Sequence, residues 1–210
     1  MKNFFLRLIT SLIITPIFIY SLYERSYFFF SLIFFILIIS FYEIYKNVKQ
    51  LKISFLLYFL ILLFAYSLFD IRGDSYKSFI YCIWVLLIVW ISDIAGYIVG
   101  KLFKGPKLSI YSPNKTMSGF FGSIVFSQLS FLVPYYLLNS FTVTFEIILI
   151  QFLLCLISIF GDIFFSYIKR INHIKDYSNI IPGHGGILDR IDGMIFVIIS
   201  YYFIKYFNVI

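Results

Sequence analysis

Residues 166–193 read SYIKRINHIKDYSNIIPGHGGILDRIDG, and they join two apolar segments, 142–168 and 191–207, that are each long enough to cross a bilayer. The stretch contains seven charged side chains and both histidines, although only 13% of the 210 residues are charged. A chain this apolar gathers ionisable groups in one place when that place binds ions or phosphate. The stretch therefore indicates a membrane protein and the position of its functional site.

Composition supports the membrane assignment. The hydrophobic fraction is 61%, against about 45–50% in soluble proteins, and a soluble domain of this size could not bury so much apolar surface. Seven segments are candidates for spanning helices: 4–20, 27–45, 53–69, 78–100, 118–138, 142–168 and 191–207. We therefore predict an all-α, polytopic integral membrane protein with about seven transmembrane helices.

The distribution of basic residues predicts the orientation. With the N-terminus in the cytoplasm, 13 of the 17 Lys and Arg residues lie in cytoplasmic segments, as the positive-inside rule requires. The net charge of +7 then reflects loops that face anionic lipid headgroups, and it does not indicate nucleic acid. We predict three N-terminal spans in residues 1–77 and a catalytic membrane domain with two basic cytoplasmic loops in residues 78–210. The wealth of Ile, Phe, Lys, Tyr and Asn favours a bacterial source.

Asp162 is a carboxylate within a predicted span. Ser166, Lys169 and Arg170 follow it at positions i+4, i+7 and i+8, so all four share one helical face. One interpretation is a snorkelling Lys–Arg pair at the end of a helix, with Asp162 as its buried partner. The other is a binding site, because a carboxylate in a span is costly unless it is paired or bound to a metal.

The five residues 182–186, Pro-Gly-His-Gly-Gly, cannot form the interior of a helix. They either make a plain turn or provide backbone N–H groups for an anion. Asp189 and Asp192 follow one helical turn apart at the start of the last span, where Asp192 could instead cap the helix. Asp189 could join Asp162 around a hard divalent cation such as Mg²⁺, which one or two carboxylates and substrate phosphates typically bind.

The other basic loop holds a second group of polar residues. Asp93 is another carboxylate in a span, while Gly96 and Gly100 are spaced for close helix packing. Ser112, Lys115 and Thr116 offer two hydroxyls and a cation to a phosphate, whereas the other lysines of the loop, Lys101, Lys104 and Lys107, are interpreted as a lipid-facing basic patch.

Together these motifs resemble the signature of the phosphatidate cytidylyltransferases, also called CDP-diacylglycerol synthases. The pattern S-x-x-K-R-x-x-x-x-K-D followed by P-G-H-G-G-x-x-D-R-x-D is filled from Ser166 to Asp192, with Gly161-Asp162 upstream. Residues 112–116, Ser-Pro-Asn-Lys-Thr, resemble the family's Ser-Pro-Lys-Lys-Thr loop. This chain departs from the family at Phe165 (usually Glu), Asn114 (Lys) and Met117-Ser118 (Trp-Glu), and it is shorter than typical members.

The resemblance implies transfer of CMP from CTP to phosphatidate, giving CDP-diacylglycerol and pyrophosphate, with Mg²⁺ as cofactor. It implies catalytic roles for Asp162, Lys169, Arg170, Lys175, Asp176, His184, Asp189 and Arg190, with Asp162 and Asp189 as ligands of one or two cations. Substrate-binding roles follow for Asp93, Ser112, Lys115, Thr116, Ser166, Gly183, Gly185, Gly186 and Asp192. The implied setting is a homodimer in the inner (plasma) membrane with its site on the cytoplasmic face.

Two alternatives use the same residues differently. A CTP-dependent polyprenol or phytol kinase would need a similar cation site, but the Lys-Arg and Pro-Gly-His-Gly-Gly pattern favours the cytidylyltransferase. An ion-coupled transporter could use Asp93, Asp162 and Glu146 as an ion pathway. It predicts polar residues along many helices, whereas the first three spans carry almost none beyond Glu43.

Overall fold

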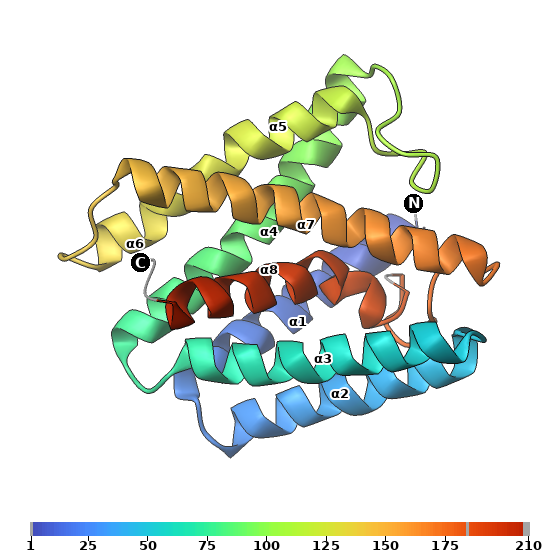
Figure 1. Ribbon diagram of the computed structural model, residues 1–210, viewed down its shortest axis with the longest axis horizontal. Coiled ribbons are helices and arrows are strands. Elements are labelled where there is room, and N and C mark those ends of the chain that lie inside the picture. The colour runs from blue at the N-terminus through green and yellow to red at the C-terminus, as the bar shows by residue number, and fades with distance from the viewer. Residues whose placement is uncertain (1, 184, 208–210) are drawn as a thin grey trace. The chain divides into compact units, whose positions relative to one another are not determined.

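The computed structural model describes residues 2–183 and 185–207, with side chains described at residue 10 and from residue 12 onward. Every regular element in this part of the chain is a helix (Figure 1). The helices are α1 (Lys2–Glu24), α2 (Tyr27–Asn47), α3 (Leu51–Arg72), α4 (Tyr76–Phe103), α5 (Met117–Ser127), the 3₁₀ helix η1 (Gln128–Phe131), α6 (Leu132–Leu137), α7 (Phe145–Ile171) and α8 (Leu188–Tyr206). The predicted all-α class is confirmed.

Five segments of the described chain are long and apolar enough to cross a membrane: Tyr27–Asn47, Leu51–Arg72, Tyr76–Phe103, Met117–Leu137 and Phe145–Ile171. They correspond to the second to sixth predicted spans. The first and seventh predicted spans fall in α1 and α8. The described side chains of α1 provide a shorter apolar helix, Leu12–Glu24, and α8 carries four charged side chains within 19 residues. A count of seven spans and the orientation of the N-terminus stay predictions.

Packing divides the chain into two compact units. Unit one comprises the residues up to Tyr66 together with Ile168–Asp192, and unit two comprises Ser67–Tyr167 together with the residues from Gly193 onward. Each unit therefore combines an earlier and a later part of the sequence. The predicted division into residues 1–77 and 78–210 concerns the location of catalysis along the chain, and it stays a prediction.

Unit one contains α1, α2 and most of α3. Ser26 is the N-cap of α2, and its hydroxyl accepts a hydrogen bond from the Phe28 amide at 3.4 Å. Figure 1 shows α2 beside α3, and the rings of Phe41 and Tyr58, with centroids 4.8 Å apart, join the two helices. The carboxyl-terminal end of α2 receives the later segment of the unit, because the Lys49 amide donates to Asn172 Oδ1 at 3.0 Å.

Unit two contains a close crossing of α4 and α5 that depends on glycine. A Cβ on Gly119 would lie 2.5 Å from the Gly96 carbonyl oxygen and 3.4 Å from the Gly100 Cα. A Cβ on Gly122 would lie 2.6 Å from the Val99 Cβ. Only glycine allows the two backbones to approach so closely. The packing role predicted for Gly96 and Gly100 is therefore confirmed.

A buried polar network stabilises the break between α5 and α6. Trp84 Nε1 donates to Gln151 Oε1 at 2.9 Å, and Gln151 Nε2 donates to the Ser127 carbonyl at 2.7 Å. Ser127 ends α5, where the following 3₁₀ turn leaves its carbonyl in need of a donor. Gln151 thereby satisfies a backbone group that neither lipid nor an apolar core could satisfy.

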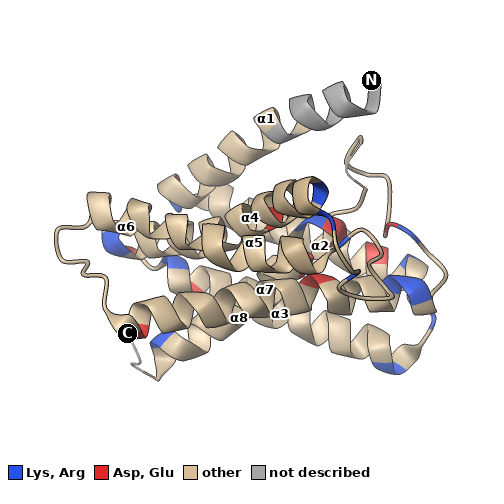
Figure 2. Cartoon of the chain, turned by 90° about the horizontal axis from the view of Figure 1, so that it is seen from above, with Lys and Arg blue, Asp and Glu red and all other residues tan. Residues whose placement is uncertain are grey.

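Charge is sparse along the helices. Figure 2 shows long uncharged stretches along the helices, with charged residues gathered mainly near helix ends and in loops. Three carboxylates are exceptions: Glu43 in α2, Asp93 in α4 and Asp162 in α7 lie inside helices long and apolar enough to span. Glu43 and Asp162 are buried, while Asp93 is exposed. These carboxylates mark the positions where function is expected.

Candidate active site

Asp162 anchors the polar site of unit two. It lies on α7 with 8% of its surface exposed, and the Lys115 ammonium forms an ion pair with its Oδ2. Gly193 of α8 makes room for it, because a Cβ there would lie 2.8 Å from Asp162 Oδ1 and 3.0 Å from Ser158 Oγ. The partner of Asp162 is therefore a loop lysine more than forty residues upstream, and not the Lys169–Arg170 pair on its own helix.

The loop between α4 and α5 folds back on itself and presents Lys115. The Leu108 amide donates to the Lys115 carbonyl at 2.8 Å, and the Lys115 amide donates to the Ser112 carbonyl at 3.1 Å. Thr116 ends the loop as the cap of α5, because its hydroxyl accepts from the Gly119 amide at 3.2 Å. The Thr116 hydroxyl predicted to contact phosphate is thus already part of a helix cap.

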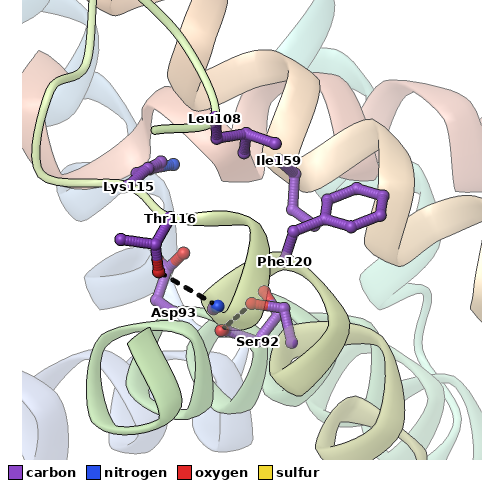
Figure 3. Close-up of a pocket in the computed structure, with 9 residues that line it drawn as sticks. Ser92, Asp93, Leu108, Lys115, Thr116, Phe120 and Ile159 are labelled. Atoms are coloured by element: carbon purple, nitrogen blue, oxygen red, sulfur yellow. Dashed lines mark hydrogen bonds between the residues drawn. The ribbon is translucent and has the colours of Figure 1, made fainter. Parts of the chain in front are cut away.

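A half-open pocket lies beside Lys115 in unit two, with an empty volume of about 310 Å³ that includes its open mouth. Its lining residues are Ser92, Asp93, Leu108, Lys115, Thr116, Gly119, Phe120, Ser123 and Ile159. In Figure 3, Lys115, Thr116 and Asp93 lie along one side, opposite the apolar side chains of Phe120 and Ile159. The structure thus brings together three predicted substrate-binding residues, while Ser112 is not among the lining residues.

Asp189 is the centre of the polar site in unit one. Its Oδ1 accepts a hydrogen bond from Lys169 Nζ at 2.7 Å, and its Oδ2 accepts from the amides of Tyr177 at 2.8 Å and Gly186 at 3.0 Å. Only 3% of its side chain is exposed. The lysine offsets the cost of burying the carboxylate, and the two amides occupy its second oxygen.

The glycine-rich loop forms a tight hairpin in front of Asp189. Ile181 and Gly185 exchange two backbone hydrogen bonds of 2.9 and 3.2 Å, and Gly183 and Gly185 have φ angles of +78° and +87°. Those φ angles lie in the region that glycine adopts without strain. The amides of Gly185 and Gly186 donate to the chain itself, so the predicted contact of these amides with phosphate would require them to exchange partners. His184 lies outside the described residues.

The other predicted residues of unit one lie around this centre. Arg170, Lys175, Asp176 and Arg190 are exposed, and Asp192 is half-buried. Tyr177 is buried next to Lys169, whose Nζ lies 5.7 Å from the centroid of its ring. Burial raises the pKa of the Tyr177 phenol, and the nearby carboxylates raise it further. The phenol is therefore neutral at physiological pH. Ser166, in unit two, is also half-buried.

Glu43 is the functional candidate that sequence reasoning missed. It is fully buried, and its carboxylate accepts hydrogen bonds from the amides of Ile187 and Leu188, each at 2.9 Å. The available signal was the rule that an ionisable residue within a span is functional by default. From the sequence, this rule selects Asp93 and Asp162. The same rule also selects Glu43.

Each unit contains one buried carboxylate of the pair predicted to bind a cation, Asp162 in unit two and Asp189 in unit one. No cluster of three or more His, Cys, Asp or Glu side chains with metal-binding geometry occurs among the described residues. Mg²⁺ is usually bound by one or two protein carboxylates, with phosphate and water oxygens completing its shell. Asp162 and Asp189 fit this role, because each is a buried carboxylate with an oxygen that a lysine already neutralises.

The chain is similar to a protein family and to several bacterial proteins. A family model described as "Cytidylyltransferase family" matches residues 46–207. The chain is 38% identical over 136 residues to a protein of Helicobacter pylori strain J99, covering 63% of this chain and 50% of the relative. Identity is 34% over 173 residues with a protein of Aquifex aeolicus, covering 80% and 62% of the two chains.

A third relative, from Staphylococcus epidermidis, is 37% identical over 131 residues, which are 62% of this chain and 49% of the relative. All three proteins are named phosphatidate cytidylyltransferase. The chain spans about half the length of the curated relatives it matches.

Proposed function

The chain belongs to the cytidylyltransferase family, and we propose that it transfers CMP from CTP to phosphatidate, giving CDP-diacylglycerol and pyrophosphate. One observation carries the proposal: two buried carboxylates, Asp162 and Asp189, are each ion-paired with a lysine. Both pairs lie within the segment that matches the family. Such pairs supply what joining two polyanions requires, namely sites for a cation and positive charges for phosphate.

The chemistry needs positioning and charge neutralisation more than proton transfer. Phosphate monoesters carry a charge of about −1.5 to −2 at neutral pH, so the lipid phosphate is a nucleophile without a general base. It attacks the α-phosphorus of CTP, and pyrophosphate leaves with the electron pair of the broken P–O bond. The barrier lies in the mutual repulsion of the two anions, which fixed positive charges lower.

Asp162 and Asp189 would hold one or two Mg²⁺ ions, and a bound Mg²⁺ would supply positive charge that offsets the negative charge of the phosphates. Lys115 pairs with Asp162 and Lys169 pairs with Asp189, so each carboxylate that would hold a cation already has an ammonium group beside it. The ammonium groups of Lys115 and Lys169 would lower the repulsion between the two phosphate-bearing substrates. Arg170, Lys175 and Arg190 are exposed on unit one and would screen the remaining charge.

We propose a multi-pass protein of seven spans in the bacterial inner membrane, with the N-terminus and both polar sites at the cytoplasmic face. Five candidate spans and bacterial relatives support the membrane setting. The 13-to-4 partition of Lys and Arg supports the orientation. We propose a homodimer, by resemblance to the family alone. A cytoplasmic site would reach a soluble nucleotide and a lipid headgroup at once.

The test is an assay of membranes that contain the chain, supplied with phosphatidate, Mg²⁺ and CTP labelled at either the α- or the γ-phosphate. We expect the α-label to enter lipid as CDP-diacylglycerol and the γ-label to leave as pyrophosphate. Transfer of the γ-label to lipid would identify a lipid kinase instead. Membranes with Asp162→Asn serve as the control, and label incorporation equal to the wild type there would refute the cation assignment.

A further inference from the structure

Glu43 lies far from the catalytic motifs in sequence, yet its carboxylate is fully buried against the loop that carries them. Its Oε1 accepts from Ser178 Oγ at 2.5 Å and from the Ile187 amide at 2.9 Å, and its Oε2 accepts from the Leu188 amide at 2.9 Å. We propose that Glu43 is a positioning residue, which holds the glycine-rich loop and the first turn of α8 so that Asp189 has its working geometry.

The hydrogen bonds explain why a carboxylate is needed. The first amides of a helix have no partner within the helix, and a negative charge at that end interacts favourably with the helix dipole. Ile187 and Leu188 precede and begin α8, so Glu43 satisfies two such amides from another helix. Hydrogen bonds to a charged acceptor are stronger than those between neutral groups.

Steric fit adds to the polar contacts. A Cβ on Gly186 would lie 2.5 Å from Glu43 Oε1 and 2.8 Å from its Oε2, so only glycine lets the loop backbone reach the carboxylate. One helical turn later on α2, Asn47 Nδ2 donates to the Tyr177 carbonyl at 2.6 Å. The end of α2 therefore holds the loop at Tyr177 and again at Ile187 and Leu188.

These contacts lead directly to Asp189. It follows Leu188 in sequence, and its Oδ2 accepts from the amides of Tyr177 and Gly186. Tyr177 is itself held by Asn47, which donates a hydrogen bond to the Tyr177 carbonyl. Gly186 packs against the carboxylate of Glu43. A shift of this loop would move both donors, and with them the carboxylate oxygen and its Lys169 partner. A displacement of about 1 Å can cost 10²-fold in rate.

The experiment compares Glu43→Gln, Glu43→Asp and the control Glu24→Gln, which makes the same chemical change at an exposed glutamate. In either orientation, the side-chain amide that Glu43→Gln introduces would turn an N–H toward a backbone N–H, of Ile187 or of Leu188. Aspartate keeps the charge but is one methylene too short to span both amides. For each purified variant we would measure kcat, KM for CTP, the Mg²⁺ concentration giving half-maximal rate, Tm, and hydrogen exchange of peptides covering residues 176–190.

In both Glu43 variants we expect the backbone amide hydrogens of residues 176–190 to exchange faster than in the wild type. We also expect kcat per folded molecule to fall by about 10–100-fold. KM for CTP should change less than threefold, while the half-saturating Mg²⁺ concentration rises several-fold because Asp189 is displaced. Glu24→Gln should match the wild type in every measurement.

Unchanged exchange in Glu43→Gln would overturn the proposal. So would faster exchange or a lower Tm with unchanged kcat and Mg²⁺ dependence, since that pattern belongs to a purely structural cap. The positioning role rests on the proposed function, but the two failures are distinguishable. A wild-type protein that makes no CDP-diacylglycerol refutes the proposed function, whereas the exchange measurement tests the hold of Glu43 on the loop without any substrate.

Discussion

Replacing Asp189 and Asp162 by asparagine should abolish activity in both cases but affect stability very differently. In Asp189→Asn the new side chain can still accept from the amides of Tyr177 and Gly186 through one oxygen, but its NH₂ then faces the Lys169 ammonium. Side-chain exposures of 3% for Asp189 and 12% for Lys169 leave that ammonium almost no access to water. Breaking a buried ion pair by removing one partner costs about 3–5 kcal/mol.

Asp162→Asn meets a milder environment. The side chain of Lys115 is 32% exposed and lies in a loop, so its ammonium can turn to solvent when the carboxylate is neutralised. We therefore expect a loss of about 1 kcal/mol, near the upper end for exposed pairs. For a chain of this size, 1 kcal/mol shifts Tm by about 2–4 °C. The expected decrease in Tm is then roughly 6–20 °C for Asp189→Asn and 2–4 °C for Asp162→Asn.

Thermal unfolding of the purified variants in the same detergent measures this difference, and the CDP-diacylglycerol assay measures activity. The double variant Lys169→Met with Asp189→Asn is the matched control, because it removes the stranded charge and should recover at least half of the lost Tm. The reasoning is refuted if Asp162→Asn lowers Tm as much as Asp189→Asn does, or if the double variant is no more stable than Asp189→Asn alone.

Three further predictions concern other parts of the chain. Gly193→Ala should reduce activity at least tenfold, because its Cβ would lie 2.8 Å from Asp162 Oδ1; activity equal to the wild type would show that the helices separate without consequence. Lys169→Ala should lower kcat by about 10²–10³-fold, whereas Lys104→Ala, at an exposed lysine in the loop between α4 and α5, should leave kcat unchanged. If both variants lost the same factor in kcat, the site would have to include Lys104. Gln151→Leu should lower Tm through the loss of its buried hydrogen bonds, with kcat per folded molecule preserved; an unchanged Tm would contradict the bridging role.

The elements of the fold were largely predictable. Long apolar segments predict helices because a membrane offers no partner to unsatisfied backbone groups, and the five helices long enough to span fall where long runs of apolar residues placed them. The glycines of α4 were also predictable as packing residues, because their four-residue spacing places them on one face. What spacing did not reveal was the partner helix, since Gly119 and Gly122 lie beyond a long loop.

For the candidate site, the sequence predicted which residues take part but not which residues pair with each other. Asp162 and Asp189 could be selected because each is a carboxylate where burial is costly. Helical spacing placed Lys169 on the face of Asp162, yet the structure pairs Lys169 with Asp189 and gives Asp162 to Lys115. Pairing depends on where loops return in space, and local periodicity carries no information about that.

The sequence alone determined that this is a helical membrane protein with its ionisable groups concentrated in two loops, because hydropathy, charge and backbone chemistry are properties of local composition. Only the tertiary structure decided how the loops are held. The amide of Gly186 donates to Asp189, and the amides of Ile187 and Leu188 donate to Glu43. The sequence predicted a loop whose amides bind an anionic ligand, whereas in the structure these amides bind carboxylates of the protein itself. The physical reason is that a buried amide takes whichever acceptor the fold brings within hydrogen-bonding distance. For Ile187 that acceptor is Glu43, which lies 144 residues earlier in the chain.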